Sequence, residues 1–85
     1  MHRAMGSLEK AALIALYEEV GFSIHAHVSV ISVQRHFAKD LRGFCGDALR
    51  GLVKKGYVIK HPTGGSMTYS LTINGVNKIK EILGQ

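Results

Sequence analysis

Five histidines and one cysteine are the side chains in this 85-residue sequence with the chemistry to bind a metal ion or act as a nucleophile. His25 and His27 are separated by one residue, so on a strand they share a face, and His36 or His61 could complete a zinc or nickel site with them. No carboxylate or cysteine stands at a spacing that fits such a site. The two histidines are therefore expected on the exposed face of an edge strand, and no metal or other cofactor is predicted.

Cys45 is the only thiol in the chain. A reactive or redox-sensing cysteine needs an exposed thiol with a lowered pKa, whereas Cys45 falls on the apolar side of a predicted helix. No nucleophilic side chain stands at a spacing from a histidine that would suggest a catalytic pair. Of the side chains that could take part in catalysis, only Cys45 and Asp47 lie near this helix. We therefore expect a buried structural cysteine, no catalytic residues and no enzymatic activity.

The positive charge of the chain is concentrated in its second half. The net charge is +5, and residues 42–85 carry seven basic and two acidic side chains, whereas residues 1–41 carry four of each. A positive field concentrated on one part of a domain attracts a polyanion, most often a nucleic acid. A solvated basic surface has the same composition, so charge alone leaves both interpretations open.

The cysteine content and the N-terminal sequence favour the cytoplasm. One cysteine excludes an internal disulfide and fits a reducing compartment. The most apolar N-terminal run, residues 11–16, is flanked by charged residues and is too short for a signal peptide or a membrane span. We expect a cytoplasmic chain without membrane contact.

Hydrophobic periodicity predicts an α+β arrangement of helices and short strands that must position the basic residues. Ser7 is expected to cap the first helix, Ser29 or Ser32 the second, and Thr72 or Asn74 the last. Residues 1–6 are expected to be a disordered segment or a tag remnant, and residues 7–85 a single domain. The predicted elements are, in order, a helix over 8–20, a short strand over 22–28, a helix over 30–39, a turn over 40–43, a helix over about 44–55, a strand over 57–61, a turn over 62–66, a strand over 67–72 and a helix over 72–83.

The third predicted helix has one apolar and one polar face. Gly46 and Gly51 lie inside it, although each glycine costs roughly 1 kcal/mol relative to alanine. They could let the helix backbone approach a phosphate or a groove wall, or Gly51 could pack against a neighbouring element. Gly56 is expected to end the helix with a positive φ. The predicted inward residues are Phe44, Cys45, Ala48, Leu49, Leu52 and Val53, and the outward ones are Gly43, Gly46, Asp47, Arg50, Gly51 and Lys54.

The helix-to-strand junction after this face carries a familiar pattern. Leu49, Leu52, Gly56, Tyr57 and Val58 match the Leu-x-x-Leu-x-x-x-Gly-(Leu/Tyr)-Val string that recurs in winged helix-turn-helix DNA-binding domains. The Tyr-Ser-Leu-Thr-Ile-Asn-Gly run at 69–75 is similar to the exit from the wing in regulators of the MarR and PadR type. The chain thus resembles a winged helix-turn-helix domain with a three-helix core, a short first strand, a β-hairpin wing and a C-terminal helix.

This resemblance implies a small transcription regulator that binds double-stranded DNA. The third helix, at about 44–55, would enter the major groove, Arg50 would contact a guanine or a phosphate, Asp47 could accept from a cytosine amino group, and the wing at 60–68 would contact the DNA backbone. In these families the terminal helices commonly form a homodimer, although no long dimerisation arms flank this domain. The alternative is a winged-helix module that binds a protein or RNA. The implied interface consists of Arg35, Lys39, Arg42, Gly46, Asp47, Arg50 and Lys54 from the helices, and Lys60, Thr63, Gly64 and Gly65 from the wing.

Overall fold

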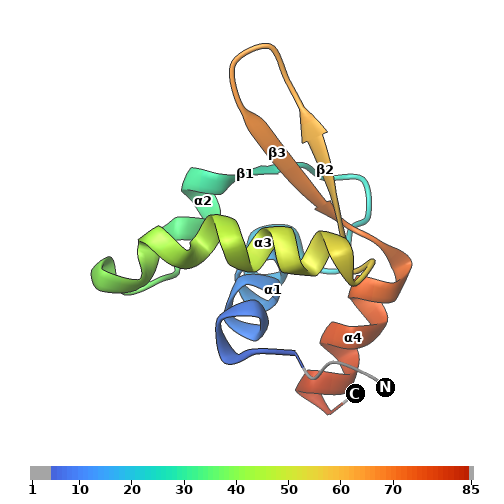
Figure 1. Ribbon diagram of the computed structural model, residues 1–85. Coiled ribbons are helices and arrows are strands. Elements are labelled where there is room, and N and C mark those ends of the chain that lie inside the picture. Colours follow the sequence, from blue (N-terminus) through green and yellow to red (C-terminus); the bar gives the residue numbers. More distant parts are fainter. Residues whose placement is uncertain (1–4, 85) are drawn as a thin grey trace.

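The computed structural model describes residues 5–84 as an α+β fold in which four α-helices pack near the base of one three-stranded antiparallel sheet (Figure 1). The predicted fold class is therefore confirmed at the level of α+β. Residues 1–4 of the segment predicted to be disordered lie outside the described residues. The elements are α1 (Ser7–Val20), β1 (Val28–Ser29), α2 (Val30–Gln34), the 3₁₀ helix η1 (Lys39–Phe44), α3 (Cys45–Lys54), β2 (Val58–Pro62), β3 (Met67–Leu71) and α4 (Ile73–Leu83).

The first helix begins one residue earlier than predicted. Gly6, and not Ser7, is the N-cap, and its amide donates a 3.1 Å hydrogen bond to Oε1 of Glu9 in the first turn. At the other end Gly21, with φ of 64°, donates to the carbonyl of Tyr17. The prediction of Ser7 as the cap is wrong because the carboxylate of Glu9 already satisfies the amide at the helix entrance.

The strand predicted over 22–28 is almost absent. Only Val28 and Ser29 pair with β3. Upstream, Oγ of Ser23 accepts hydrogen bonds from the amides of His25 and Ala26, each at 3.2 Å, and these bonds tie the chain into a bend. The alternating pattern misled because a serine hydroxyl competes with a strand ladder for backbone donors.

The second helix is also shorter than predicted. It ends at Gln34 and is followed by η1, whereas the sequence predicted a helix over 30–39 and a turn over 40–43. Ser29 caps it by accepting from the amide of Ser32 at 3.3 Å, as one of the two expected caps. The β-branched run at its start disfavours a longer helix. Backbone amides of the following turn bond to the last carbonyls of the helix: His36 donates to Val33 and Phe37 donates to Gln34.

Arg42 supplies a further donor to this turn. Its Nε lies 3.2 Å from the carbonyl oxygen of Gln34 and 3.3 Å from that of Phe37. The Gln34 carbonyl also accepts from the amide of Phe37 at 2.9 Å, so the Arg42 side chain from η1 adds a second donor there and holds the turn that follows α2. This role of Arg42 could not be expected from a continuous helix.

The predicted hairpin is confirmed. The strand order is β1-β3-β2, both pairings are antiparallel, and Val58 lies opposite Leu71 at the base of the hairpin. Pro62 belongs to β2 and not to the turn, which is tolerated because β2 is an edge strand. The hairpin projects well beyond the helices (Figure 1).

The start of α4 is tied to the end of α3. Oγ1 of Thr72 accepts from the amide of Gly75 at 2.9 Å and donates to the carbonyl of Gly56 at 2.7 Å, so Thr72 is the cap. The amide of Thr72 also donates to the carbonyl of Tyr57 at 3.1 Å. Gly56 has φ of 81°, as predicted for the end of the third helix. A Cβ at buried Gly75 would overlap the Tyr57 carbonyl, so only glycine permits this contact.

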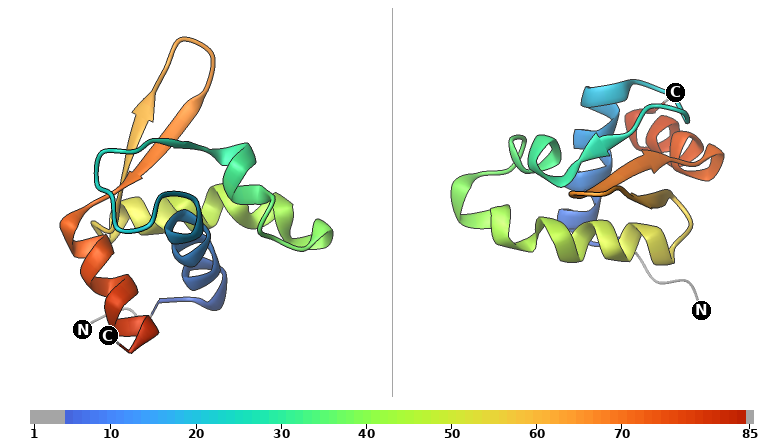
Figure 2. Two further views of the ribbon diagram at one scale, coloured as in Figure 1. Left: turned by 180° about the vertical axis from the view of Figure 1, so that it is seen from behind. Right: turned by 90° about the horizontal axis from the view of Figure 1, so that it is seen from above.

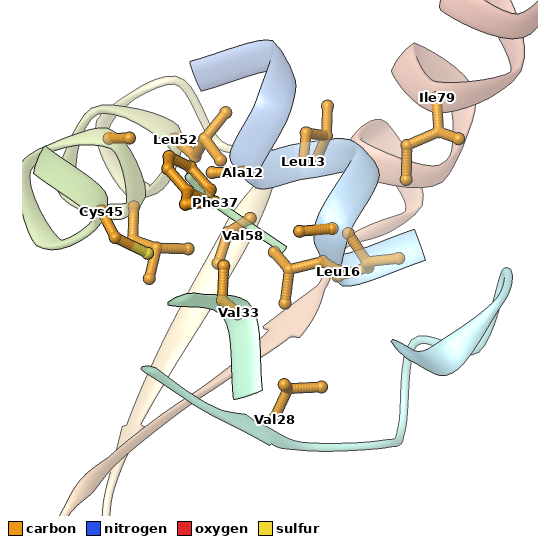
Figure 3. Close-up of a cluster of buried hydrophobic side chains, with 14 of the residues drawn as sticks. Ala12, Leu13, Leu16, Val28, Val33, Phe37, Cys45, Leu52, Val58 and Ile79 are labelled. Atoms are coloured by element: carbon orange, nitrogen blue, oxygen red, sulfur yellow. The ribbon is translucent and has the colours of Figure 1, made fainter. Parts of the chain in front are cut away.

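The core joins all four α-helices to the inner face of the sheet (Figure 3). Ile14 and Tyr17 of α1 are partly buried and pack against this core. Phe44 was expected inside but is 50% exposed, because it belongs to η1 and not to an α-helical stripe. Leu41 of the same 3₁₀ helix is 37% exposed. The largest fully buried side chains are Leu13, Leu16, Val33, Cys45, Leu49, Leu52, Val58, Leu71 and Ile79.

None of the helices within residues 5–84 has the length and apolar character needed to cross a membrane.

Candidate nucleic-acid interface

One face of α3 is covered by the core and the other is open. Ala48, Leu49 and Leu52 are buried against the rest of the domain, whereas Asp47 and Arg50 are exposed. Figures 1 and 2 show α1 behind α3, and within residues 5–84 no other helix lies in front of it. Of the predicted outward face of the third helix, Gly43, Asp47, Arg50 and Lys54 are exposed, whereas Gly46 and Gly51 are half-buried.

Gly51 faces α1 instead of solvent. A Cβ at this position would overlap the carboxylate of Glu9. Both oxygens of Glu9 lie 2.9 Å from Nζ of Lys55, and the two side chains are only 17% and 21% exposed. The structure therefore favours the packing explanation for Gly51. It also shows that the positive charge of Lys55 is already matched within the domain.

Gly46 has the opposite surroundings. Nothing lies within 4 Å of a Cβ built there. It lines a cavity of about 190 Å³ between α3 and the hairpin, together with Arg50, Val53, Lys60, Met67 and Tyr69. We call this cavity the α3–hairpin groove. Its floor carries apolar and aromatic side chains, and both of its charged lining residues are cations.

A second and wider hollow lies on the other side of Arg50. It measures about 530 Å³ and is lined by Glu9, Asp47, Arg50, Gly51, Lys54, Lys55 and Tyr57. Arg50 lines both hollows, so this residue lies between them on the open face of α3. Its Nη1 lies 2.9 Å from Oδ1 of Asp47 one helical turn earlier.

Three further predicted basic residues lie around the connection from α2 to α3. Arg35 is the C-cap of α2 and Lys39 begins η1, so they do not lie on one continuous helix as the predicted helix over 30–39 implied. Both side chains are exposed. Arg42 uses its Nε on the end of α2, while its two terminal amino groups have no hydrogen-bond partner among residues 5–84.

At the hairpin tip most polar side chains are engaged with the hairpin itself. The hydroxyl of Thr63 donates to the carbonyl of Ser66 at 2.8 Å and accepts from the Ser66 amide at 3.1 Å. Within residues 5–84, no hydrogen bond uses the amides of Gly64 and Gly65, which are exposed. Lys60 is exposed on β2. Of the predicted wing residues, Lys60 and the two glycine amides are thus free to meet a ligand, whereas Thr63 closes the turn.

The four histidines within residues 5–84 do not converge on a metal site. The rings of His27 and His61 stack with centroids 4.0 Å apart, and Nε2 of His61 lies 2.9 Å from Oγ of Ser70. His36 instead lies 2.8 Å from Oε2 of Glu19. Among residues 5–84, no three His, Cys, Asp or Glu side chains are close enough to hold a metal ion.

Cys45 is fully buried, as expected. Burial raises the pKa of its thiol, because the thiolate would lose hydration. We expect a thiol reagent to label the native protein at least about a hundredfold more slowly than the denatured protein, since access requires unfolding. A time course of labelling with and without denaturant measures this ratio, and equal rates would contradict a buried thiol.

The same pKa shift predicts how stability depends on pH. The thiol loses its proton at a lower pH in the unfolded protein than in the native protein, because burial raises its pKa in the native state. Once the pH exceeds the ordinary thiol pKa, the native state therefore holds more protons than the unfolded state, and stability falls as the pH rises. The contribution of Cys45 to stability is therefore complete at neutral pH and is lost as the pH rises through that range. Unfolding curves of Cys45→Ala and of the unsubstituted protein between about pH 7 and 10 should converge; a constant gap would contradict this linkage.

The sequence did not predict the apolar residues that line the α3–hairpin groove. Met67 and Tyr69 were assigned only to a strand, and Val53 was assigned to the core, whereas all three line the groove. Strand alternation does place Met67 and Tyr69 on one face, but pairing with α3 requires the tertiary structure. Comparison with protein-family models and with curated proteins gave no match for this chain.

Proposed function

We propose that this chain is a winged helix-turn-helix domain that binds double-stranded DNA as a small transcription regulator. The observation that carries the proposal is the α3–hairpin groove, where Arg50 and Lys60 meet beside a helix face that no other described helix covers. The major groove of B-DNA admits an α-helix, and a projecting hairpin can follow the adjacent backbone.

The proposed contacts divide into base reading and backbone binding. Arg50 stands at the middle of the open face and donates to a guanine edge or to a phosphate. Lys54 and Lys60, both exposed, neutralise phosphates on either side of it. Gly46 permits close approach because no side chain fills the space above it.

The remaining basic residues bind backbone at the edges of this face. Arg35, Lys39 and the free amino groups of Arg42 surround the connection into α3 and add phosphate contacts there. At the hairpin tip the amides of Gly64 and Gly65 can donate to a phosphate, since a glycine backbone approaches closely.

A protein or RNA partner is the second candidate function. Two exposed apolar side chains, Leu41 and Phe44, lie in η1 at the leading end of α3, where a protein partner would bury them. Asp47 also places a negative charge on the open face, which weakens attraction to phosphates.

Fluorescence anisotropy with a labelled DNA duplex of mixed sequence tests the proposal. We expect binding at about 50 mM salt and a plot of log affinity against log salt with a slope of roughly −3.6 to −5.4, as four to six neutralised phosphates require. An RNA duplex of the same sequence is the control, since its deep, narrow major groove excludes a helix, and it should bind more weakly. Absence of DNA binding at low salt would contradict the proposal and favour a protein partner.

A further inference from the structure

The Asp47–Arg50 ion pair stands at the centre of the open face of α3. Nη1 of Arg50 lies 2.9 Å from Oδ1 of Asp47, and the side chains are 70% and 73% exposed. Solvent screens so exposed a pair, and its contribution to folding is small. An acidic residue in the first turn also interacts favourably with the helix N-terminus, but this does not require an arginine beside it.

The pair works against binding to DNA of arbitrary sequence. Arg50 must give up part of its contact with Asp47 before it can meet a phosphate or a base. The Asp47 carboxylate is then left unpaired among phosphates, and like charges repel. A duplex that offers Arg50 its acceptors but gives Asp47 no donor therefore binds poorly.

A guanine and a neighbouring cytosine remove this conflict. Guanine presents the acceptors O6 and N7 to the forked donors of an arginine, and cytosine presents the donor N4 amino group to a carboxylate. Positions i and i+3 of a helix are neighbours on its surface, so the two side chains can reach adjacent bases. An A·T pair offers an amino donor, but no base edge with two acceptors for the arginine.

We propose that Asp47 and Arg50 together make this domain select G·C over A·T base pairs, with Arg50 donating to guanine O6 and N7 while Asp47 accepts from cytosine N4. The inference rests on the proposed DNA-binding function. Asp47 acts as a specificity residue: it lowers affinity for duplexes that leave its carboxylate without a donor.

Two duplexes and three proteins test this selection. The probes are labelled duplexes of alternating G and C and of alternating A and T, and the proteins are the unsubstituted chain, Asp47→Ala and Glu81→Ala. Glu81 is the control, because it is an exposed carboxylate in an i,i+3 ion pair with half-buried Lys78 at 3.2 Å on α4. Comparing proteins on the same two duplexes cancels differences in DNA shape.

We expect the unsubstituted protein and Glu81→Ala to prefer the G·C duplex about tenfold. Asp47→Ala should bind the A·T duplex several-fold more tightly than the unsubstituted protein does. Its preference for the G·C duplex over the A·T duplex should therefore narrow to about twofold. The slope of log affinity against log salt should become steeper by about one. Circular dichroism confirms that the variants are folded, and Asp47→Ser replaces Asp47→Ala if the latter is not.

Two results would overturn the inference, and they differ in what else they overturn. If Asp47→Ala keeps the full preference, or gains no affinity for the A·T duplex, Asp47 is not a specificity residue while DNA binding stands. If the unsubstituted protein binds neither duplex at low salt, the proposed function fails together with the inference.

Discussion

Arg50→Ala is expected to lower the affinity for a DNA duplex about 5- to 150-fold. Arg50 is the residue that lines both hollows of the open α3 face, so its loss removes the central donor group of the proposed interface. An arginine contact to a guanine edge is worth about 1 to 3 kcal/mol, which gives this range. Anisotropy titrations at one fixed salt concentration measure the change.

Lys80→Ala is the matched control, because it removes one positive charge away from this face. The Lys80 ammonium lies 5.2 Å from the centre of the Phe22 ring, just beyond the C-terminal end of α1. That end of α1 points away from α3 (Figure 2). We expect its affinity to stay within about twofold of the unsubstituted protein. If both variants lose the same DNA affinity, the DNA is attracted to the net positive charge of the protein and not to the face that carries Arg50.

Gly75→Ala is expected to lower the free energy of unfolding by about 3 kcal/mol. The added Cβ would overlap the carbonyl of Tyr57, and backbone atoms cannot rotate away as a side chain can. Relief requires moving the N-terminus of α4, and this strains the hydrogen bonds of Thr72 to Gly56 and Tyr57. Urea unfolding followed by circular dichroism measures the loss.

Gly46→Ala is the control for this substitution, since Gly46 also lies in the first turn of a helix. Nothing surrounds a Cβ there, and alanine has the higher helix propensity. We expect an unchanged stability or a gain of up to about 1 kcal/mol. A similar loss of stability in both variants would show that the Tyr57 contact does not explain the effect at Gly75.

Local sequence signals predicted the second half of the chain well. Gly56 ends α3 with a positive φ, Thr72 caps α4, and the two β-rich runs form the hairpin, all as expected. Each of these features depends on residues close in sequence. These signals act on the backbone of neighbouring residues, so they can be recognised in the sequence. They are a glycine at a helix end, a hydroxyl at a helix start and a run of alternating residues in a strand.

The first half was predicted less well because its structure depends on side chains that reach across the fold. The hydroxyl of Ser23 bends a segment that alternates like a strand, and Arg42 closes α2 from η1. Gly51 accommodates Glu9, which is 42 residues away in sequence. Periodicity contains no information on such contacts, so the bounds of α2 and the role of Gly51 required the structure.

The open face itself was only partly predictable. The helical period placed Asp47, Arg50 and Lys54 on one exposed side, in agreement with the structure. It did not reveal that Thr63 is engaged within the hairpin turn, or that Tyr69 lines a groove with Arg50. Both features arise from how the hairpin folds and lies against α3.

The most direct test of DNA binding through this face is a map of amide chemical-shift changes in the ¹⁵N-labelled protein on addition of a DNA duplex. The proposal predicts the largest changes in the exposed part of α3 around Arg50, at Lys60 and at Gly64 and Gly65, with little change along α4. Changes concentrated on α1 and α4, or no changes at low salt, would contradict DNA binding through the α3–hairpin groove.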